Sequence, residues 1–391
     1  MPLALLAQSE VYHTFYDPTA PVTATPWLLF TILKMLIVFT VLMVGVAMLT
    51  LAERKISAWI QDRIGPNRTG YGGLLQPAAD GLKNIMKEET YPDAANMPLF
   101  ILAPMLSFIP ALITFAVIPF AAPLSTRWGL VEMSVANLPI GFLYILAISS
   151  LGVYGIVLAG WSSNNKYSLL GGLRSSAQMV SYEISMGMAA VAVLLLSGNV
   201  SLQAIVTQQQ AMGWNVFPLL IGFFVFCVAA FAETNRLPFD MPEAESELIA
   251  GYHTEYSAMK FSMFFIAEYS NMVTASALMV TLFFGGWDIP GTQWDNLPPW
   301  TVLKFVLTLG FFLAKLLFFL FLYMWIRWTL PRFRYDQLMS VGWKVMLPIG
   351  LGYLVIMAAA VLGLDAAGIA QTTRWAGVVP VYWALLGVLN I

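Results

Sequence analysis

Apolar residues run through this chain in long stretches that short polar segments separate. About 20 consecutive apolar residues are needed for a helix to cross the hydrocarbon core of a membrane. Eight stretches approach or exceed this length, and the fifth, at 17 residues, is expected to extend into its flanks. The stretches cover residues 27–52, 97–120, 138–160, 176–196, 216–232, 261–284, 301–328 and 343–364. The pattern predicts an all-α polytopic membrane protein with eight transmembrane helices and irregular loops.

The eight stretches form one membrane domain over residues 27–364, because neither a long linker nor an internal repeat divides them. Residues 1–26 precede it as an N-terminal segment, and residues 365–391 follow as a C-terminal tail. The tail contains an apolar segment at 375–389 that Pro380 interrupts. A short ninth span, a re-entrant piece and an interfacial helix are all compatible with its length. We favour a peripheral or short tilted segment.

Composition narrows the classes of function. The chain is 59% hydrophobic and 10% charged, whereas charged residues make up about 25% of a typical soluble protein. With a net charge of −2 and no basic tail, the sequence lacks the basic patch that nucleic-acid-binding proteins carry. Cys227 is the only cysteine, and the two histidines, His13 and His253, lie outside the apolar stretches. Disulfides, cysteine-ligated clusters and haem between paired transmembrane histidines are therefore excluded. We expect the chain to bind no metal, haem or flavin.

Lysine and arginine lie mostly on one side of the predicted spans. Of the 19 basic residues, 14 fall in or beside the loops after spans one, three, five and seven, and only Arg127 and Arg374 fall on the opposite side. Cytoplasmic loops carry such an excess. The asymmetry predicts that these four loops lie inside the cell and that the N-terminus lies outside.

The segment from Phe231 to Asn271 concentrates acidic residues between two apolar stretches. It holds seven of the chain's 21 acids, which are Glu233, Asp240, Glu243, Glu245, Glu247, Glu255 and Glu268. An ionisable residue at membrane depth is costly and by default marks an ion or proton path or a ligand site. This acid loop is therefore the strongest candidate for the functional site.

Two prolines predict the local structure of the acid loop. Pro238 and Pro242 make residues 235–241 a turn or extended segment, after which a helix can begin. On that helix, residues spaced four apart from Glu243 to Glu255 would share one face. Like charges on one face repel, so some of these carboxyls should hold protons near neutral pH. A purely structural alternative applies to the first three acids of the helix, because carboxylates stabilise its first turns.

The loop after the first stretch is the second chemical element. Residues Ile56 to Ile64 place apolar and polar side chains at helical spacing, which predicts an amphipathic surface helix that Gly65 and Pro66 end. Trp59 within it suits a membrane interface. The alternative is that the basic residues of this loop form a solvated positive face that only sets the topology.

Three further ionisable residues occupy or end apolar stretches. Glu183 lies within the fourth stretch, where a lone carboxylate is more often functional than structural. Glu53 ends the first stretch beside Arg54 and Lys55, so an interfacial salt bridge explains it as well as a functional role does. Lys315 lies in the middle of the seventh stretch, where it could pair with an acid or snorkel to the interface. Its role stays open.

Two long motifs resemble a known family. They are ETNRLPFDMPEAESELIAGYHTEYSAMKFSMFFIAEY, from Glu233 to Tyr269, and AERKISAWIQDRIGPNRTGYGGLLQPAADGLKNIMKEE, from Ala52 to Glu89. Both resemble the quinone-site membrane subunits of proton-pumping NADH:quinone oxidoreductase, respiratory complex I. The resemblance extends over residues 27–364, and ungapped motifs of this length are far more specific than a short pattern.

The resemblance implies a function, partners and a location. Members of this family form part of the quinone chamber in the bacterial inner membrane and begin a chain of buried acids that leads to the proton-pumping subunits. The peripheral arm supplies electrons from an iron–sulfur cluster. The implied partners are therefore the peripheral-arm and membrane-arm subunits, membrane lipids and quinone, which is the substrate.

The resemblance also implies roles for single residues. We expect a proton or charge relay through eight acids, which are Glu53, Glu183, Glu233, Glu243, Glu245, Glu247, Glu255 and Glu268. We expect five residues to line or gate the quinone tunnel, which are Arg54, Arg63, Asp80, Lys83 and Arg236. Asp240 is a weaker candidate for either role.

Two alternative functions share part of this pattern. A membrane anchor of an energy-conserving hydrogenase would keep the acids but lack a quinone site, and the long GPNR to LQPAADG block argues against it. A stand-alone ion transporter would show inverted repeats or paired broken helices, and the sequence contains neither.

Overall fold

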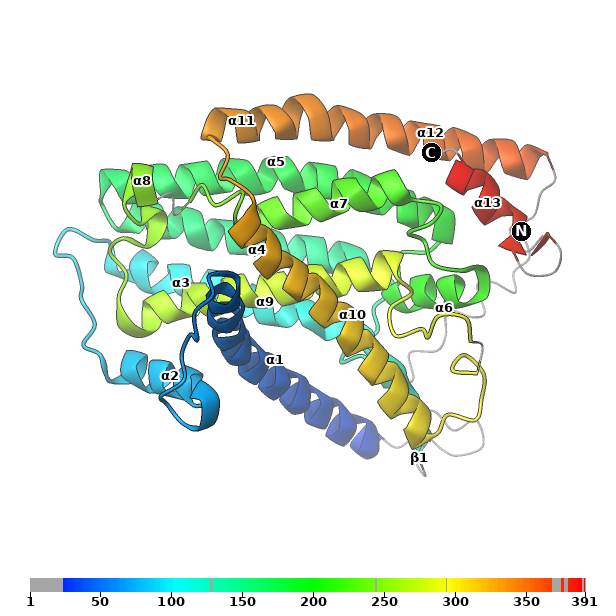
Figure 1. Cartoon of the computed structure of the whole chain (residues 1–391), viewed down its shortest axis with the longest axis horizontal. Coiled ribbons are helices and arrows are strands. Elements are labelled where there is room, and N and C mark those ends of the chain that lie inside the picture. Colours follow the sequence, from blue (N-terminus) through cyan, green and yellow to red (C-terminus); the bar gives the residue numbers. More distant parts are fainter. Residues whose placement is uncertain are drawn as a thin grey trace.

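The framework of the protein is a set of long helices packed side by side (Figure 1). The computed structural model describes residues 24–126, 129–242, 245–292, 294–367, 374–375, 379–388 and 390. Within these residues, seven helices are long and apolar enough to cross a membrane. They are α1 (Ala24–Ile60), α3 (Met97–Ile113), α4 (Gly141–Ser162), α5 (Lys166–Ser197), α9 (Ala258–Phe283), α10 (Val302–Thr329) and α12 (Leu347–Ala366), which continues from α11 (Tyr335–Ser340) through a π-helical turn. The predicted all-α polytopic class is confirmed.

The fifth predicted span is shorter than expected. Helix α7 covers Leu220–Glu233, which is 14 residues or about 21 Å at 1.5 Å per residue, against a hydrocarbon core of about 30 Å. The expected N-terminal extension does not form, because residues 215–219 are turns. Asn215 fixes them by donating its Nδ2 to the Leu282 carbonyl at 3.0 Å. By its own length, α7 therefore reaches only part of the way across a membrane.

Two short helices, α6 (Leu202–Met212) and α13 (Val381–Val388), lie near the start of α7. Asn390, just after α13, donates Nδ2 to the Pro218 carbonyl at 2.6 Å and accepts from the Ile221 amide at 3.4 Å. These bonds satisfy backbone groups that a helix start leaves without partners. The described part of the C-terminal tail thus packs against α7, and at eight residues α13 is too short to cross a membrane.

The predicted surface helix over Ile56–Ile64 is wrong. Residues 56–60 are the last turns of α1, which continues past the apolar stretch. Ala58 is fully buried, so this end of α1 packs inside the protein. The chain leaves the helix at Asp62, whose φ is +53°. The separate surface helix is α2 (Gln76–Met86), several of whose apolar side chains are exposed.

The acid loop does not form the helix predicted after Pro242. Helix α8 is a single turn, Glu245–Leu248, and a 3₁₀ turn follows at Gly251–His253. Ile249 between them has a φ of +67°, which breaks the helical path. Acids spaced four apart in this loop therefore do not share a helix face. The turn predicted over residues 235–241 is confirmed.

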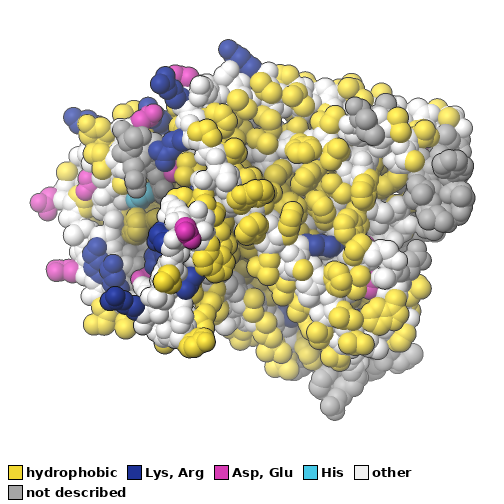
Figure 2. All heavy atoms as spheres, in the orientation of Figure 1, with side chains coloured by type: hydrophobic (Ala, Val, Ile, Leu, Met, Phe, Trp, Pro, Cys, Tyr) yellow, Lys and Arg dark blue, Asp and Glu magenta, His cyan; other side chains and the backbone are white. Residues whose placement is uncertain are grey.

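The ends of the molecule differ in polarity. Figure 2 shows that most charged side chains on the visible face gather at the end where α2 and α8 lie, while hydrophobic atoms cover most of the rest. Short hairpins are formed by β1 (Ala121–Thr126) with β2 (Gly129–Met133) and by β3 (Arg374–Trp375) with β4 (Val379–Pro380). The charged end carries the acid loop and the segment that follows α1, residues 61–96, which contains α2.

Candidate functional site

Glu53 lies in a buried cluster where four segments meet. It stands near the end of α1 and is 6% exposed. Tyr269 of α9 donates its hydroxyl to Glu53 Oε2 at 2.6 Å. Arg327, at the end of α10, forms an ion pair with Glu53 Oε1. Arg236, from the loop after α7, places Nη1 3.4 Å from the same oxygen. Partners from three other segments therefore hold this carboxylate.

Arg236 connects Glu53 to a second carboxylate. Its Nε lies 2.6 Å from Glu268 Oε1, and its guanidinium lies 4.2 Å from the centre of the Tyr269 ring. Two carboxylates thus face two guanidinium groups, so the formal charge of the cluster is zero. Close pairing of this kind offsets the cost of burying ionic groups. The buried Nη2 of Arg236 has no hydrogen-bond partner among the described residues.

The interfacial salt bridge between Glu53 and its sequence neighbours does not form. Arg54 points to the surface helix α2 instead and pairs with Asp80 at 2.7 Å. Gln76 also donates to Asp80, at 3.0 Å. The carboxylate of Asp80 therefore ties the end of α1 to the start of α2.

The predicted tunnel residues divide into two groups. Arg54 and Asp80 form the exposed pair just described, and Lys83 lies exposed in the last turn of the same helix. Arg63 is also exposed and donates Nε to Gln61 at 2.8 Å. Arg236, by contrast, belongs to the buried Glu53 cluster.

Glu183 and Glu233 form a second acidic site within the helices. Glu183, on α5, accepts a hydrogen bond from the Ser150 hydroxyl at 2.5 Å. Glu233, the last residue of α7, lies within hydrogen-bonding reach of Ser149 and close enough to Glu183 for their charges to interact. Neither carboxylate forms an ion pair with a described lysine or arginine. Two predicted relay acids are therefore brought together with hydroxyl partners.

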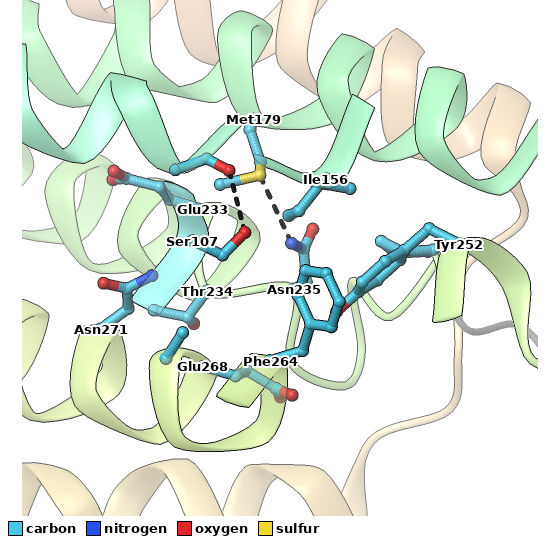
Figure 3. A pocket seen from close by; sticks show the side chains of 13 residues that line it. Ser107, Ile156, Met179, Glu233, Thr234, Asn235, Tyr252, Phe264, Glu268 and Asn271 are labelled. Atoms are coloured by element: carbon cyan, nitrogen blue, oxygen red, sulfur yellow. Dashed lines mark hydrogen bonds between the residues drawn. The ribbon is translucent and has the colours of Figure 1, made fainter. Parts of the chain in front are cut away.

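A small cavity lies between the two acidic sites. Its polar lining side chains are Ser107, Glu233, Thr234, Asn235, Glu268 and Asn271. Its volume is about 30 Å³, which holds about two water molecules and is too small for a quinone head group. Figure 3 shows the Glu233 and Glu268 carboxylates at different sides of the cavity. The cavity therefore brings polar side chains from the end of α7 and from α9 around one small space that apolar side chains also line.

The other acids of the loop have separate partners. Arg332 pairs with Asp240 at 2.8 Å, Arg174 pairs with Glu247 at 2.7 Å, and Asn165 donates to Glu255 at 2.7 Å. The prediction that these carboxylates repel one another on a common face is wrong for Glu247 and Glu255, because each turns to a different donor. Glu243 lies outside the described residues, as does the side chain of Glu245.

Metal ligands are scarce in the part of the chain that the structure describes, where no group of three His, Cys, Asp or Glu side chains could hold an ion. His253 is buried among rings, with Phe261 5.2 Å and Tyr252 5.0 Å away between ring centres. This surrounding favours a packing role over metal binding. That the protein binds no metal, haem or flavin stays a prediction.

Lys315 holds the end of α9. Its Nζ donates to the carbonyls of Phe284, Gly286 and Asp288 at 2.7–3.0 Å and lies 4.5 Å from the centre of the Trp214 ring. Helix C-termini leave carbonyls without partners, and a cation there is favourable. An ammonium group has three donors, and all three are used. Neither an acid partner nor snorkelling is needed to explain this lysine.

The sequence does not predict two members of the Glu53 cluster. In the sequence, Arg327 is one of several basic residues near the end of the seventh apolar stretch, and nothing in the acid motif singles out Tyr269. The signal for Tyr269 is its place next to Glu268, one residue further along the same helix. No local signal marks Arg327, because its partner Glu53 lies 274 residues earlier in the chain.

Comparison with known proteins gives consistent matches over most of the chain. A family model described as NADH dehydrogenase matches residues 33–358. The H-subunit of NADH-quinone oxidoreductase from Leptospira biflexa is 52% identical over 339 residues, covering 84% of this chain and 93% of the relative. The first of the numbered H-subunits of Cytophaga hutchinsonii is 50% identical, with 83% and 94% covered. The H-subunit of Flavobacterium johnsoniae is 47% identical, with 85% and 95% covered.

Proposed function

The chain belongs to the NADH dehydrogenase family, and from this premise we propose that it is the quinone-site membrane subunit of a proton-translocating NADH:quinone oxidoreductase. In this role it forms part of the quinone chamber and begins the acidic relay that couples quinone reduction to proton translocation. The observation that carries the proposal is the Glu183–Glu233 pair, which is connected by a small cavity to the Glu53 cluster.

The energetics of the pair favour proton carriage. A charged carboxylate within a span costs roughly 3 kcal/mol on insertion scales. Two neighbouring carboxylates without a cation cannot both be charged cheaply. A proton held between them would therefore be favourable, and a site of this kind suits a relay. Glu268 lines the same water-sized cavity as Glu233, so we expect a proton to pass between them along water and side chains.

The quinone chamber would adjoin the Glu53 cluster. α1, α2, α9 and α10 meet there, and in the family the first and sixth spans, here α1 and α9, frame the opening for quinone. The unpartnered Nη2 of Arg236 supports a role in binding a carbonyl or a negative charge, provided that the cluster opens when quinone binds. Arg54, Asp80 and Lys83 would line the outer part of the path, towards the peripheral arm.

The partners and the location follow from the same role. Electrons would come from an iron–sulfur cluster of the peripheral arm, and protons would continue into the pumping subunits of the membrane arm. The protein would be a multi-pass protein of the bacterial cell membrane, with the acid loop on the cytoplasmic side and the N-terminus outside. The gathering of charged side chains at one end supports this orientation.

The test is to replace each acid of the pair in an assembled complex. Glu183→Gln and Glu233→Gln keep a hydrogen-bonding group but cannot carry a proton, so coupled turnover should fall roughly 10²- to 10⁴-fold. Glu→Asp should restore part of it. The measurements are quinone reduction and proton uptake in vesicles. Asp365→Asn, an exposed acid at the end of α12, is the control and should keep wild-type rates. Near-normal pumping by both Gln variants would overturn the proposed relay.

A further inference from the structure

Residues 61–96, between α1 and α3, form the first inner loop of the proposed topology, and a compact set of contacts fastens this loop to the start of α9. Lys260 forms an ion pair with Glu89, and its Nζ lies 3.8 Å from the centre of the Tyr91 ring. Tyr91 donates its hydroxyl to Glu89 Oε2 at 2.6 Å. The Thr90 amide donates to the Ser257 hydroxyl at 3.0 Å. We call residues 89–91 with Ser257 and Lys260 the strap.

Ser257 and Lys260 do not stabilise the start of α9 in the way that residues at these positions usually do. Ser257 occupies the N-cap, where a serine normally accepts a hydrogen bond from its own helix. Its hydroxyl makes no such bond and instead accepts one from Thr90. Lys260 lies in the first turn, where the helix dipole disfavours a cation, and it is only 8% exposed. Residues that break a local rule in this way point to a role elsewhere, and here that role is to hold the loop.

The strap joins the two sides of the proposed chamber. The loop side carries α2, whose last residue Met86 is three residues before Glu89, and α2 holds Asp80 and Lys83. The helix side carries Glu268, eight residues after Lys260, which is about 12 Å along α9. A helix transmits position over that distance as a rigid body, so the strap fixes the spacing between these two sides.

We propose that Lys260 is a positioning residue for quinone binding, which acts by fixing the first inner loop against α9 through Glu89 and Tyr91. The inference rests on the proposed function, because it assumes that the two sides enclose quinone. Lys260 does not touch the reacting atoms. It sets the width of the site, so its loss should weaken quinone binding more than it slows the chemistry.

The experiment compares variants in the assembled complex. Lys260→Met and Glu89→Gln should each raise the KM for a short-chain quinone by roughly tenfold, because small misplacements in a binding site have effects of this size or larger, while kcat changes by less than about twofold. Lys260→Arg, which keeps the charge, should stay near the wild-type KM. The double variant should not raise KM further than either single variant does, since each single variant already breaks the same Lys260–Glu89 interaction.

Glu88→Gln is the matched control. Glu88 precedes Glu89, is exposed and makes no ion pair with a described residue, so its replacement should leave KM unchanged. Wild-type KM in both strap variants, with or without a lower melting temperature, would reduce the strap to a structural feature and overturn the inference. That outcome leaves the proposed function untouched if Glu233→Gln still abolishes coupled turnover, so the two failures are distinguishable.

Discussion

The Glu53 cluster and the Glu183–Glu233 pair hold buried or half-buried carboxylates in opposite ways. In the cluster, Arg236 and Arg327 supply a cation for each carboxylate. In the pair, the partners are serine hydroxyls and the other acid. A carboxylate matched by a cation gains little from taking up a proton, whereas two carboxylates without a cation relieve their repulsion by doing so. The difference favours an anchoring and binding role for the cluster and proton carriage for the pair.

The largest effect is expected from removing a cation of the cluster. Arg236→Met leaves Glu53 and Glu268 with too little positive charge, and breaking a buried ion pair costs about 3–5 kcal/mol. The variant should lower the melting temperature and the yield of assembled complex. Arg174→Met, which breaks the more exposed pair with Glu247, is the control and should cost at most about 1 kcal/mol.

A second variant keeps this prediction testable if Arg236→Met does not assemble. Glu53→Gln combined with Arg236→Met removes one charge of each sign, so it should be more stable than Arg236→Met alone. Equal losses from Arg236→Met and Arg174→Met would show that burial and pairing do not set the stability of the cluster, and the comparison would fail.

The melting temperature of the complex should change in the opposite direction when an acid of the Glu183–Glu233 pair is replaced. Glu183→Gln and Glu233→Gln remove a costly charge and keep a hydrogen-bond acceptor for the serines, so the melting temperature of the complex should stay equal or rise. Glu53→Gln should lower it, because it leaves the buried Arg236 and the half-buried Arg327 with less negative charge. Thermal unfolding of the three assembled variants decides the matter. A fall for Glu233→Gln as large as that for Glu53→Gln would erase the distinction between the two regions.

The sequence predicted the features that depend on composition over short windows. The long spans follow from runs of about 20 apolar residues, and the acid loop follows from the concentration of acids and two prolines. The surface helix was misplaced because the apolar stretch ends near Ala52 although the α-helix continues to Ile60. Hydropathy shows which part of a helix favours the membrane. It does not show where the helix ends, because the backbone hydrogen bonds of α1 continue beyond the apolar stretch.

The partners within the site could not be predicted in the same way. Glu53 meets Arg236, Tyr269 and Arg327 across 183, 216 and 274 residues of sequence. No local spacing encodes such contacts, because the packing of four segments creates them. The predicted acid helix failed for a different reason. Ile249 adopts a positive φ, which is uncommon for a β-branched residue and which neither spacing nor propensity foretells.

The smallest expected effect is the pH dependence of the strap, which depends on Glu89. Like the acids of the Glu53 cluster, Glu89 is paired with a cation, but it lies outside the spans. The hydrogen bond from Lys260, and then that from Tyr91, lowers the pKa of Glu89 below its ordinary value of 4.5. A depressed carboxyl pKa stabilises the folded state above the ordinary value, and this contribution is lost as the pH falls through the lowered one. The strap should therefore be indifferent to pH above about 5 and loosen only below 4.5. The measurement is the hydrogen-exchange protection of the Thr90 amide, which should fall in acid in the wild type and stay low and flat in Glu89→Gln. The same acid-induced fall in the variant would mean that another group controls the loop.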